Sequence, residues 1–213
     1  MQASENNLEN VAVAVLAGGN SSRCETGDKR ELVIGGMALG RRAVLNALSL
    51  SDRVFIIGSP HPSYQDLPIS CFQDEIPGFG PLSGLHAALI HAETDWCYLL
   101  ACDMPLISPE WYDFLRKKAC TAPERSAFIA RTSDGYLEPF HGLYSSRLKH
   151  PLEEFLQKHQ TNSKRLSISS FLATVGFYAI EAEDVLTCIR DWQLFASINC
   201  QREYLKFIKN YRY

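Results

Sequence analysis

The chain has 213 residues, and its 21 Lys and Arg against 24 Asp and Glu give a net charge of −3 at neutral pH. This weak acidity, with an isoelectric point near 6.1, excludes the basic surface by which a protein binds nucleic acid or an anionic membrane. Hydrophobic residues make up 46% of the chain, enough to bury the core of a globular domain.

Two features of the sequence bear on the compartment of the protein. No apolar run approaches the roughly 18 residues of a membrane-spanning helix, and residues 1–10 form a polar, acidic tail unlike a signal peptide. The seven cysteines are spread along the chain without a C-x-x-C pair, which excludes a zinc knuckle and a thioredoxin-like motif. We therefore expect a soluble, cytoplasmic protein with free thiols.

The first half of the chain alternates strand patterns with helical patterns. An uncharged, β-branched run at 11–17 predicts a buried strand that leads directly into the loop 18–23. Ser108 and Pro109 are typical of the N-cap and first residue of a helix. The other predicted strands are 53–58, 69–72 and 96–102, and the other predicted helices are 38–50 and 82–91. This alternation favours a mostly parallel, doubly wound, Rossmann-like α/β sheet flanked by helices.

The second half is less regular. Two strands, 127–131 and 143–144, are predicted on either side of a turn at 133–135. A helix at 147–160, a strand at 173–180 and a terminal helix at 201–211 follow. No repeat, low-complexity tract or long linker divides the chain, so we expect a polar tail at 1–10 and a single domain at 11–213.

Three polar segments follow predicted strands of the first half, at 18–29, 74–84 and 103–108. In an open parallel sheet, ligands bind beyond the carboxyl ends of the strands. We therefore expect these three segments to meet at one edge of the sheet and to form a ligand site there.

The first of these segments has the composition of a phosphate-binding loop. Gly18 and Gly19 let backbone N–H groups approach a ligand, and Arg23 and Lys29 add positive charge within a dozen residues. The glycines match neither a Walker A loop nor a dinucleotide fingerprint. From the residues alone, a polyphosphate site and an ordinary strand-to-helix turn are equally compatible with this segment.

The other two segments carry carboxylates. Asp103 stands where a buried strand ends, and a carboxylate there suits Mg²⁺, although the residue taken alone favours a cap of the turn before Pro105. Asp74 precedes a loop dense in glycine and proline, which could pack against a planar base or be an ordinary surface loop.

These motifs together resemble those of a known family. Leu16-Ala17-Gly18-Gly19-x-Ser21-Ser22-Arg23 with Asp28-Lys29 resembles the signature of Rossmann-like nucleotidyltransferases. The segments 77–84 and 101–105 are similar to those of the molybdenum cofactor guanylyltransferases, the MobA family, and 195–199 looks like that family's last strand. The resemblance implies an enzyme that transfers GMP from GTP to molybdopterin with Mg²⁺ and releases pyrophosphate. It also implies a nucleotide-binding half at 11–106, an acceptor-binding half at 107–213 and, as protein partners, other cofactor-biosynthesis proteins or molybdoenzymes.

The resemblance also assigns roles to individual residues. The implied catalytic residues are Arg23, Lys29 and Asp103, and the implied metal ligands are Asp103 and Asn199. The implied nucleotide-binding residues are Leu16, Ala17, Gly18, Gly19, Lys29, Asp74, Gly80, Pro81, Gly84 and Asp103.

The chain departs from the family pattern in three places. Family members commonly carry an Asn after the second strand, where this chain has Ile57-Gly58-Ser59-Pro60. Cys24-Glu25-Thr26 replaces the usual Met-Gly after the arginine, and a carboxylate there repels phosphate by on the order of 1 kcal/mol. Asn199-Cys200-Gln201 replaces the closing Asn-Thr-Pro. Two alternative hypotheses therefore accompany the main one: a nucleotidyltransferase with another nucleotide or acceptor, such as a sugar phosphate, or a nucleotide- or cofactor-binding protein that has lost turnover.

Overall fold

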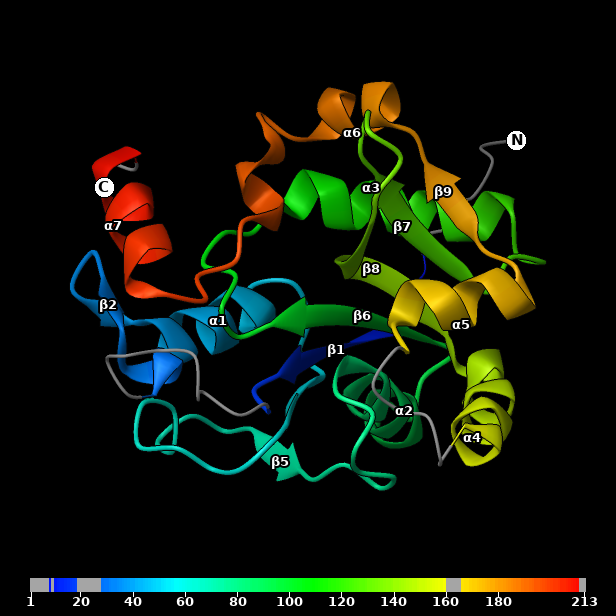
Figure 1. Ribbon diagram of the computed structural model, residues 1–213, viewed down its shortest axis with the longest axis horizontal. Helices are drawn as coiled ribbons and strands as arrows, with labels where there is room; N and C mark the ends of the chain where they lie inside the picture. The colour runs from blue at the N-terminus through cyan, green and yellow to red at the C-terminus, as the bar shows by residue number, and fades with distance from the viewer. Residues whose placement is uncertain (1–7, 9, 19–27, 160–165, 211–213) are drawn as a thin grey trace, which may run out of the picture.

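A seven-stranded sheet runs through the computed structural model, which describes residues 8, 10–18, 28–159 and 166–210. The strand order is β5-β4-β1-β6-β8-β7-β9 (Figure 1). The strands are β1 (Val11–Leu16), β4 (Val54–Ile57), β5 (Ser70–Phe72), β6 (Trp96–Ala101), β7 (Ala127–Arg131), β8 (Leu137–Ser145) and β9 (Tyr178–Ile180). β1 pairs in parallel with β4 and β6, β4 with β5, and β7 with β9, whereas β8 runs antiparallel to both of its neighbours. The expected mostly parallel α/β sheet is thus confirmed.

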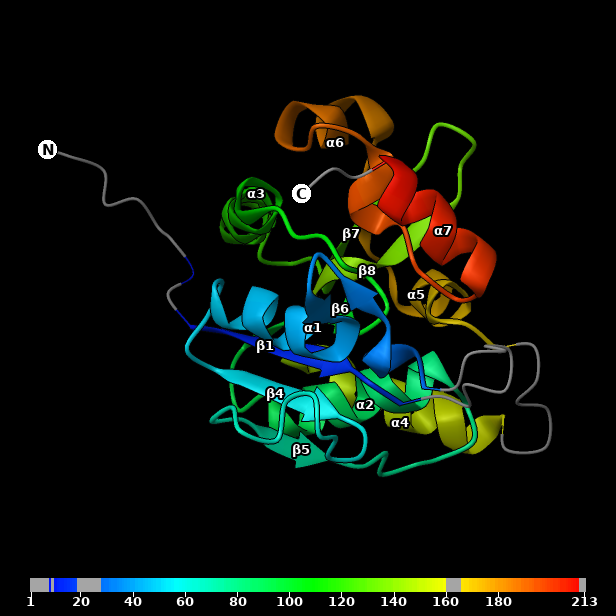
Figure 2. The same ribbon diagram turned by 90° about the vertical axis from the view of Figure 1, so that its left-hand side faces the viewer.

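Helices cover both faces of this sheet, as Figures 1 and 2 show. Side chains of β1 alternate between the faces: Val13 lies in the cluster with α1 (Leu39–Leu48), α3 (Pro109–Thr121) and α6 (Ala182–Cys188). Ala14 lies in the opposite cluster, with α2 (Pro81–His91), α4 (Lys149–Lys158) and α5 (Ile168–Val175). All six residues of β1 are buried, because a central parallel strand has a helical layer on each side.

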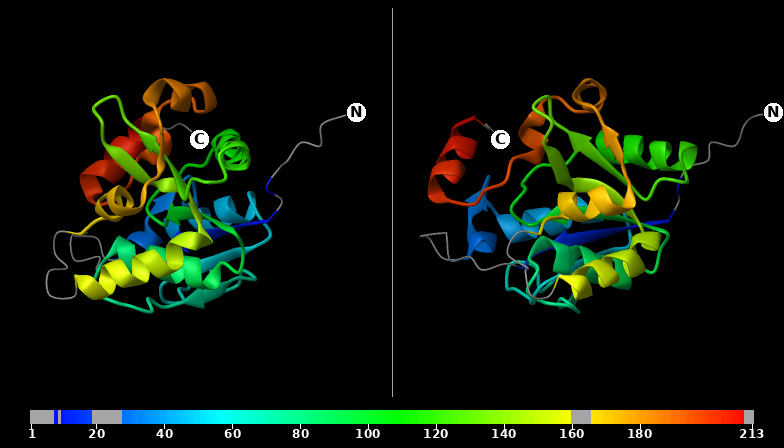
Figure 3. Two further views of the ribbon diagram at one scale, coloured as in Figure 1. Left: turned by 90° about the vertical axis from the view of Figure 1, so that its right-hand side faces the viewer. Right: turned by 45° about the vertical axis from the view of Figure 1, so that its right-hand side comes forward.

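A smaller third cluster joins two segments that are far apart in the sequence, around residues 32–39 and 198–207. The last helix, α7 (Gln201–Asn210), packs against the hairpin of β2 (Val33–Ile34) and β3 (Met37–Ala38) (Figure 3). Phe207 and Ile198 are buried there with Ile34, and the Tyr204 hydroxyl donates a hydrogen bond of 2.7 Å to the carbonyl of Val33. This packing holds residues 198–199 close to the carboxyl end of β6, where the Ile198 amide bonds to the carbonyl of Asp103.

Most of the predicted elements are confirmed, and Ser108 caps α3 as expected by accepting a hydrogen bond from the Trp111 amide. The strand predicted at 173–180 is wrong over its first half, where α5 ends at Val175 and only β9 is extended. The strand expected at 195–199 is also wrong. Phe195 closes the short 3-10 helix η4 (Trp192–Phe195), and 196–199 is irregular.

The structure also bears on the membrane and on the cysteines. Along the described ranges, no helix is both long and apolar enough to span a bilayer. Six cysteines fall within these ranges, and all six are free thiols.

Candidate functional site

The carboxyl ends of β1, β4 and β6 form the floor of the site. The Ala17 amide donates to the carbonyl of Ile57 at 2.9 Å, and the Cys102 amide donates to the carbonyl of Leu16 at 3.0 Å. These bonds extend the sheet by one residue past β1 and β6, so the segments after the two strands leave it side by side. Ala17 is half-buried and Gly18 is exposed at this edge.

Three polar side chains from distant parts of the chain meet above this floor. The ammonium of Lys29, in the 3-10 helix η1 (Lys29–Glu31), donates a 2.7 Å hydrogen bond to Oδ1 of Asn199. The same nitrogen lies 3.6 Å from Oδ2 of Asp103. Lys29 and Asn199 are 170 residues apart in the sequence, and the fold nevertheless places them with Asp103 in one cluster.

Backbone and side-chain bonds hold Asn199 in this cluster. The Ile198 amide donates to the carbonyl of Asp103 at 2.9 Å, which ties the two segments together. The side-chain amide of Asn199 donates to the Ser197 hydroxyl, and its backbone amide donates to the carboxylate of Glu203 on α7. Because these contacts use its N–H groups, the Oδ1 atom of Asn199 faces the Lys29 ammonium.

Lys29 is positioned by its sequence neighbours. Asp28 caps η1 by accepting from the amide of Arg30, and it also pairs with the guanidinium of Arg30 at 2.6 Å. This hydrogen bonding lowers the pKa of Asp28. The guanidinium also donates to the hydroxyl of Tyr64 and the carbonyl of Ser59. Arg30 therefore satisfies Asp28 and leaves Lys29 to face Asp103 and Asn199.

The surroundings of the Asp103 carboxylate are suited to binding a cation. Burial raises the pKa of the Asp103 carboxyl, and the nearby Lys29 ammonium offsets this only in part. A carboxylate and an amide oxygen, those of Asp103 and Asn199, already share one cation in the structure. Hard oxygen donors of this kind fit Mg²⁺, which usually takes one or two protein carboxylates and completes its shell with water and phosphate. Nowhere in the described ranges do three His, Cys, Asp or Glu side chains gather into a metal cage, so the remaining ligands would come from substrate and solvent.

The loop before α2 forms the second wall of the site. Gly80 has a φ of 56° and precedes Pro81, the first residue of the helix, and the Ser83 hydroxyl accepts from the amide of Phe79. A Cβ atom at Gly84 would lie 2.7 Å from a methyl group of Leu16. The glycine thus lets α2 approach the end of β1 closely, so that Gly80 and Pro81 are exposed at the same edge of the sheet.

The structure brings together some of the predicted site residues and not others. Leu16, Ala17 and Gly18 lie at the sheet edge, and Lys29, Asp103 and Asn199 form the polar cluster. Asp74 is exposed, partial desolvation raises its pKa, and no described residue bonds to its side chain. The predicted residues Gly19 and Arg23, and the unusual Cys24-Glu25-Thr26, lie outside the described residues.

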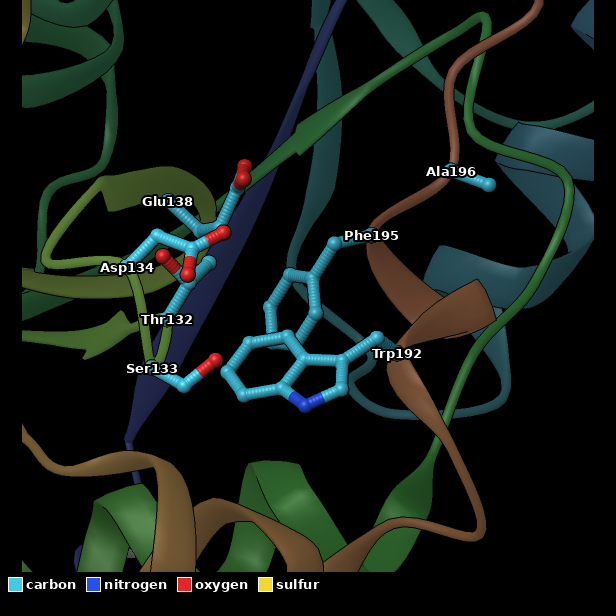
Figure 4. Close-up of a pocket in the computed structure, with 7 residues that line it drawn as sticks. All are labelled: Thr132, Ser133, Asp134, Glu138, Trp192, Phe195 and Ala196. Atoms are coloured by element: carbon cyan, nitrogen blue, oxygen red, sulfur yellow. The ribbon is translucent and has the colours of Figure 1, made fainter.

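A cavity of about 340 Å³ lies between the β7–β8 turn and η4 (Figure 4). Asp134 and Glu138 line one side and Trp192 and Phe195 line the other. None of these four residues was predicted as a site residue from the sequence. The turn predicted at 133–135 is the only local pattern near them, because Trp192 and Phe195 come more than fifty residues after Asp134 and Glu138.

His141 is part of the core beneath this cavity. It is fully buried with a φ of 54°, its Nδ1 lies 3.1 Å from the Tyr98 hydroxyl, and burial lowers its pKa to about 3. This placement makes it a packing residue.

The buried imidazole predicts a pH dependence of stability. Unfolded histidine titrates near pH 6.5, so the folded state loses stability as the pH falls from there toward 3. Between pH 7 and pH 5 we expect this residue alone to lower the free energy of unfolding by about 2 kcal/mol. Urea unfolding of wild type and His141→Gln at both pH values measures it. The variant should show the smaller loss, and equal losses would contradict the prediction.

Comparison with known proteins shows which family and which structures the chain resembles. The family model of the MobA-like NTP transferase domain matches residues 13–173. A molybdenum cofactor guanylyltransferase of Syntrophotalea carbinolica is 29% identical over 196 residues, which cover 92% of this chain and 90% of that protein. One of Vibrio atlanticus is 35% identical over 149 residues, covering 68% and 73%. The crystal structure of molybdopterin-guanine dinucleotide biosynthesis protein A from Archaeoglobus fulgidus has a TM-score of 0.76 at 22% identity, covering 93% of this chain and 97% of that one, which shows a shared fold.

Proposed function

Because this chain belongs to the family of MobA-like NTP transferase domains, we propose that it transfers GMP from GTP to molybdopterin, with or without its metal. The terminal phosphate oxygen of the acceptor attacks the α-phosphorus of GTP and forms a new P–O bond. The bond from the α-phosphorus to the bridging oxygen of the β-phosphate breaks, and pyrophosphate leaves. Positioning and charge neutralisation supply most of the rate enhancement of such a transfer, and no covalent bond to the protein is needed.

The residues at the sheet edge have separate tasks in this proposal. The backbone of Leu16, Ala17 and Gly18 lines the nucleotide, and Gly80 and Pro81 form the opposite wall. The Lys29 ammonium neutralises charge on the phosphates. The carboxylate of Asp103 and the amide oxygen of Asn199 would hold Mg²⁺, and a bound Mg²⁺ supplies Lewis-acid polarisation of phosphoryl oxygens. Residues 11–106 thus form the nucleotide half and 107–213 the acceptor half.

One observation carries the proposal: Lys29 Nζ lies 2.7 Å from Asn199 Oδ1 and 3.6 Å from Asp103 Oδ2, at the edge where the strand-end loops emerge. A cation and a carboxylate at one rim are the two groups that a nucleoside triphosphate with its metal requires. A structure with Lys29 and Asp103 far apart would have left no common site for them.

The test is a direct assay. Purified protein is incubated with GTP, Mg²⁺ and molybdopterin, and mass spectrometry measures the guanine dinucleotide and pyrophosphate. We expect both products, and we expect CTP and UTP to compete weakly with GTP. A preference for CTP or UTP would remove the guanine assignment. GTP binding without product would favour the alternative of a binding protein that has lost turnover. The replacement of the usual Met-Gly by Cys24-Glu25-Thr26 is the reason for considering this alternative.

Gly58 offers a test of how the fold positions the nucleotide loop. Its φ is 144°, and a Cβ atom there would lie 2.9 Å from the backbone carbonyl carbon of Ala17. Since that atom cannot move without displacing Gly18, we expect Gly58→Ala to lower the free energy of unfolding by about 2 kcal/mol and to weaken GTP binding. Denaturant unfolding and titration with GTP measure the two effects.

A matched variant isolates the backbone strain. Gly36 also has a positive φ, of 78°, but no atom lies within 4 Å of a Cβ built there. Gly36→Ala should therefore cost stability through strain alone and keep the GTP affinity of the wild type. Equal GTP affinities in the two variants would show that Gly58 does not position the loop.

A further inference from the structure

The cavity beside η4 has an aromatic side. Trp192 and Phe195 line it, with ring centroids 5.3 Å apart. The Phe195 ring packs edge-on against His141 and Trp111 in the core. These contacts fix Phe195, while the half-buried indole of Trp192 remains at the cavity (Figure 4). The indole thus offers a flat surface on which a planar ring can stack.

The opposite side of the cavity is acidic and polar. Figure 4 shows the carboxyl groups of Asp134 and Glu138 and the hydroxyl of Ser133 on the hairpin that faces Trp192. Neither carboxylate forms an ion pair or hydrogen bond with any described residue. Glu138 is half-buried, and desolvation raises its pKa. A half-buried carboxylate without a partner is suited to a ligand that donates hydrogen bonds to it.

The cavity lies on the acceptor side of the polar cluster. Asp103 is the second residue after the end of β6, which lies between β1 and β8 in the sheet. The nucleotide loop follows β1, whereas Glu138 belongs to β8, whose beginning lies beside the end of antiparallel β6. Ala196 lines the cavity, and two residues later Ile198 bonds to the carbonyl of Asp103. The two ligand regions therefore flank Asp103.

We propose that this cavity recognises the pterin ring of the acceptor, with the ring stacked on Trp192 and with the carboxylate of Glu138 accepting hydrogen bonds from the 2-amino group and the adjacent ring N–H. The inference rests on the proposed function, which supplies a pterin as substrate. The volume of the cavity, about 340 Å³, is within the range of small-molecule sites. Guanine presents the same donor edge, but the nucleotide loop lies on the other side of Asp103.

The binding test uses two small heterocycles and needs no turnover. Pterin carries the 2-amino donor, and lumazine carries a carbonyl oxygen in its place. Calorimetric titration of the full-length protein should show at least about tenfold tighter binding of pterin, because the lumazine carbonyl repels the Glu138 carboxylate. In Glu138→Gln the amide can donate to lumazine, so this preference should disappear. Trp192→Ala should weaken both ligands about tenfold.

Controls separate these effects from charge or folding. Glu183→Gln, on the exposed surface of α6, removes the same charge elsewhere and should keep the wild-type preference for pterin. Saturating GTP should leave pterin affinity unchanged. An unchanged preference in Glu138→Gln, the same change in Glu183→Gln, or displacement of pterin by GTP would each overturn the proposal.

The acceptor assay distinguishes this inference from the proposed function. If wild type binds pterin with the stated preference but transfers no GMP to molybdopterin, the proposed function fails and the pterin cavity stands. If wild type transfers GMP and Glu138→Gln keeps the wild-type KM for molybdopterin, the proposed function stands and the cavity assignment fails. We expect the variant to raise this KM at least about tenfold and to leave the KM for GTP unchanged.

Discussion

Replacing Asp103 by asparagine is expected to lower the turnover of GMP transfer by at least about 100-fold, with the fold intact. The substitution keeps the shape of the side chain but removes the negative charge that faces Lys29 at 3.6 Å and that would hold Mg²⁺. The loss should appear in kcat, measured at saturating GTP and molybdopterin. Mg²⁺ binding, measured by calorimetry with GTP present, should weaken in parallel.

The stability of Asp103→Asn separates a loss of catalysis from a loss of folding. Burial raises the pKa of Asp103, so its ionised form costs folding free energy at neutral pH. Asp103→Asn should therefore unfold at the same denaturant concentration as wild type or at a higher one. Asp52→Asn, which removes an exposed aspartate, is the matched control and should keep full turnover. A turnover near that of wild type in Asp103→Asn would make Asp103 a structural residue.

Replacing Lys29 by glutamine is expected to lower kcat/KM for GTP by about 100-fold. A cation close to a phosphate contributes a few kcal/mol at a partly buried site, and that amount corresponds to such a factor. The amide of glutamine keeps a donor for Asn199, whose Oδ1 now accepts from Lys29 at 2.7 Å, but it brings no charge. Steady-state kinetics with varied GTP measure the effect.

Two variants control for charge and for position. Lys29→Arg keeps the positive charge and should recover part of the lost activity, limited by the different shape of the guanidinium. Lys117→Gln removes a charge from the exposed face of α3 and should behave like wild type. If Lys29→Gln and Lys117→Gln lowered kcat/KM equally, the effect would come from net charge and not from the site.

Local patterns were sufficient for most of the fold. The buried run of β1, the helical spacing of α1 and the Ser108 cap of α3 are properties of neighbouring residues, and each element forms close to where it was expected. The strand predicted at 173–180 failed because its apolar residues suit either structure. The helix α5 begins earlier, at a reciprocal pair of hydrogen bonds between Ser167 and Ser170, and its apolar face packs in the core.

Part of the site was likewise expected from local patterns, and part was not. The segments after β1 and β6 were expected to meet because parallel strands share a carboxyl edge, and Leu16 and Cys102 do bond there. The expected strand at 195–199 failed because Phe195 packs into the core and Ile198 bonds to Asp103 instead of to a neighbouring strand. Glu138 and Trp192 were not predicted as site residues because neither belongs to a motif.

The sequence by itself determined the alternating elements, the sheet class and the loops at its carboxyl edge, because these depend on side-chain periodicity and on turn residues close together in the chain. Only the tertiary structure decided that Asn199 faces Lys29 and that Trp192 faces Glu138 across a cavity. Such contacts join segments tens to hundreds of residues apart. Their geometry follows from how α7, η4 and antiparallel β8 pack against the rest of the molecule, and no local pattern encodes that packing.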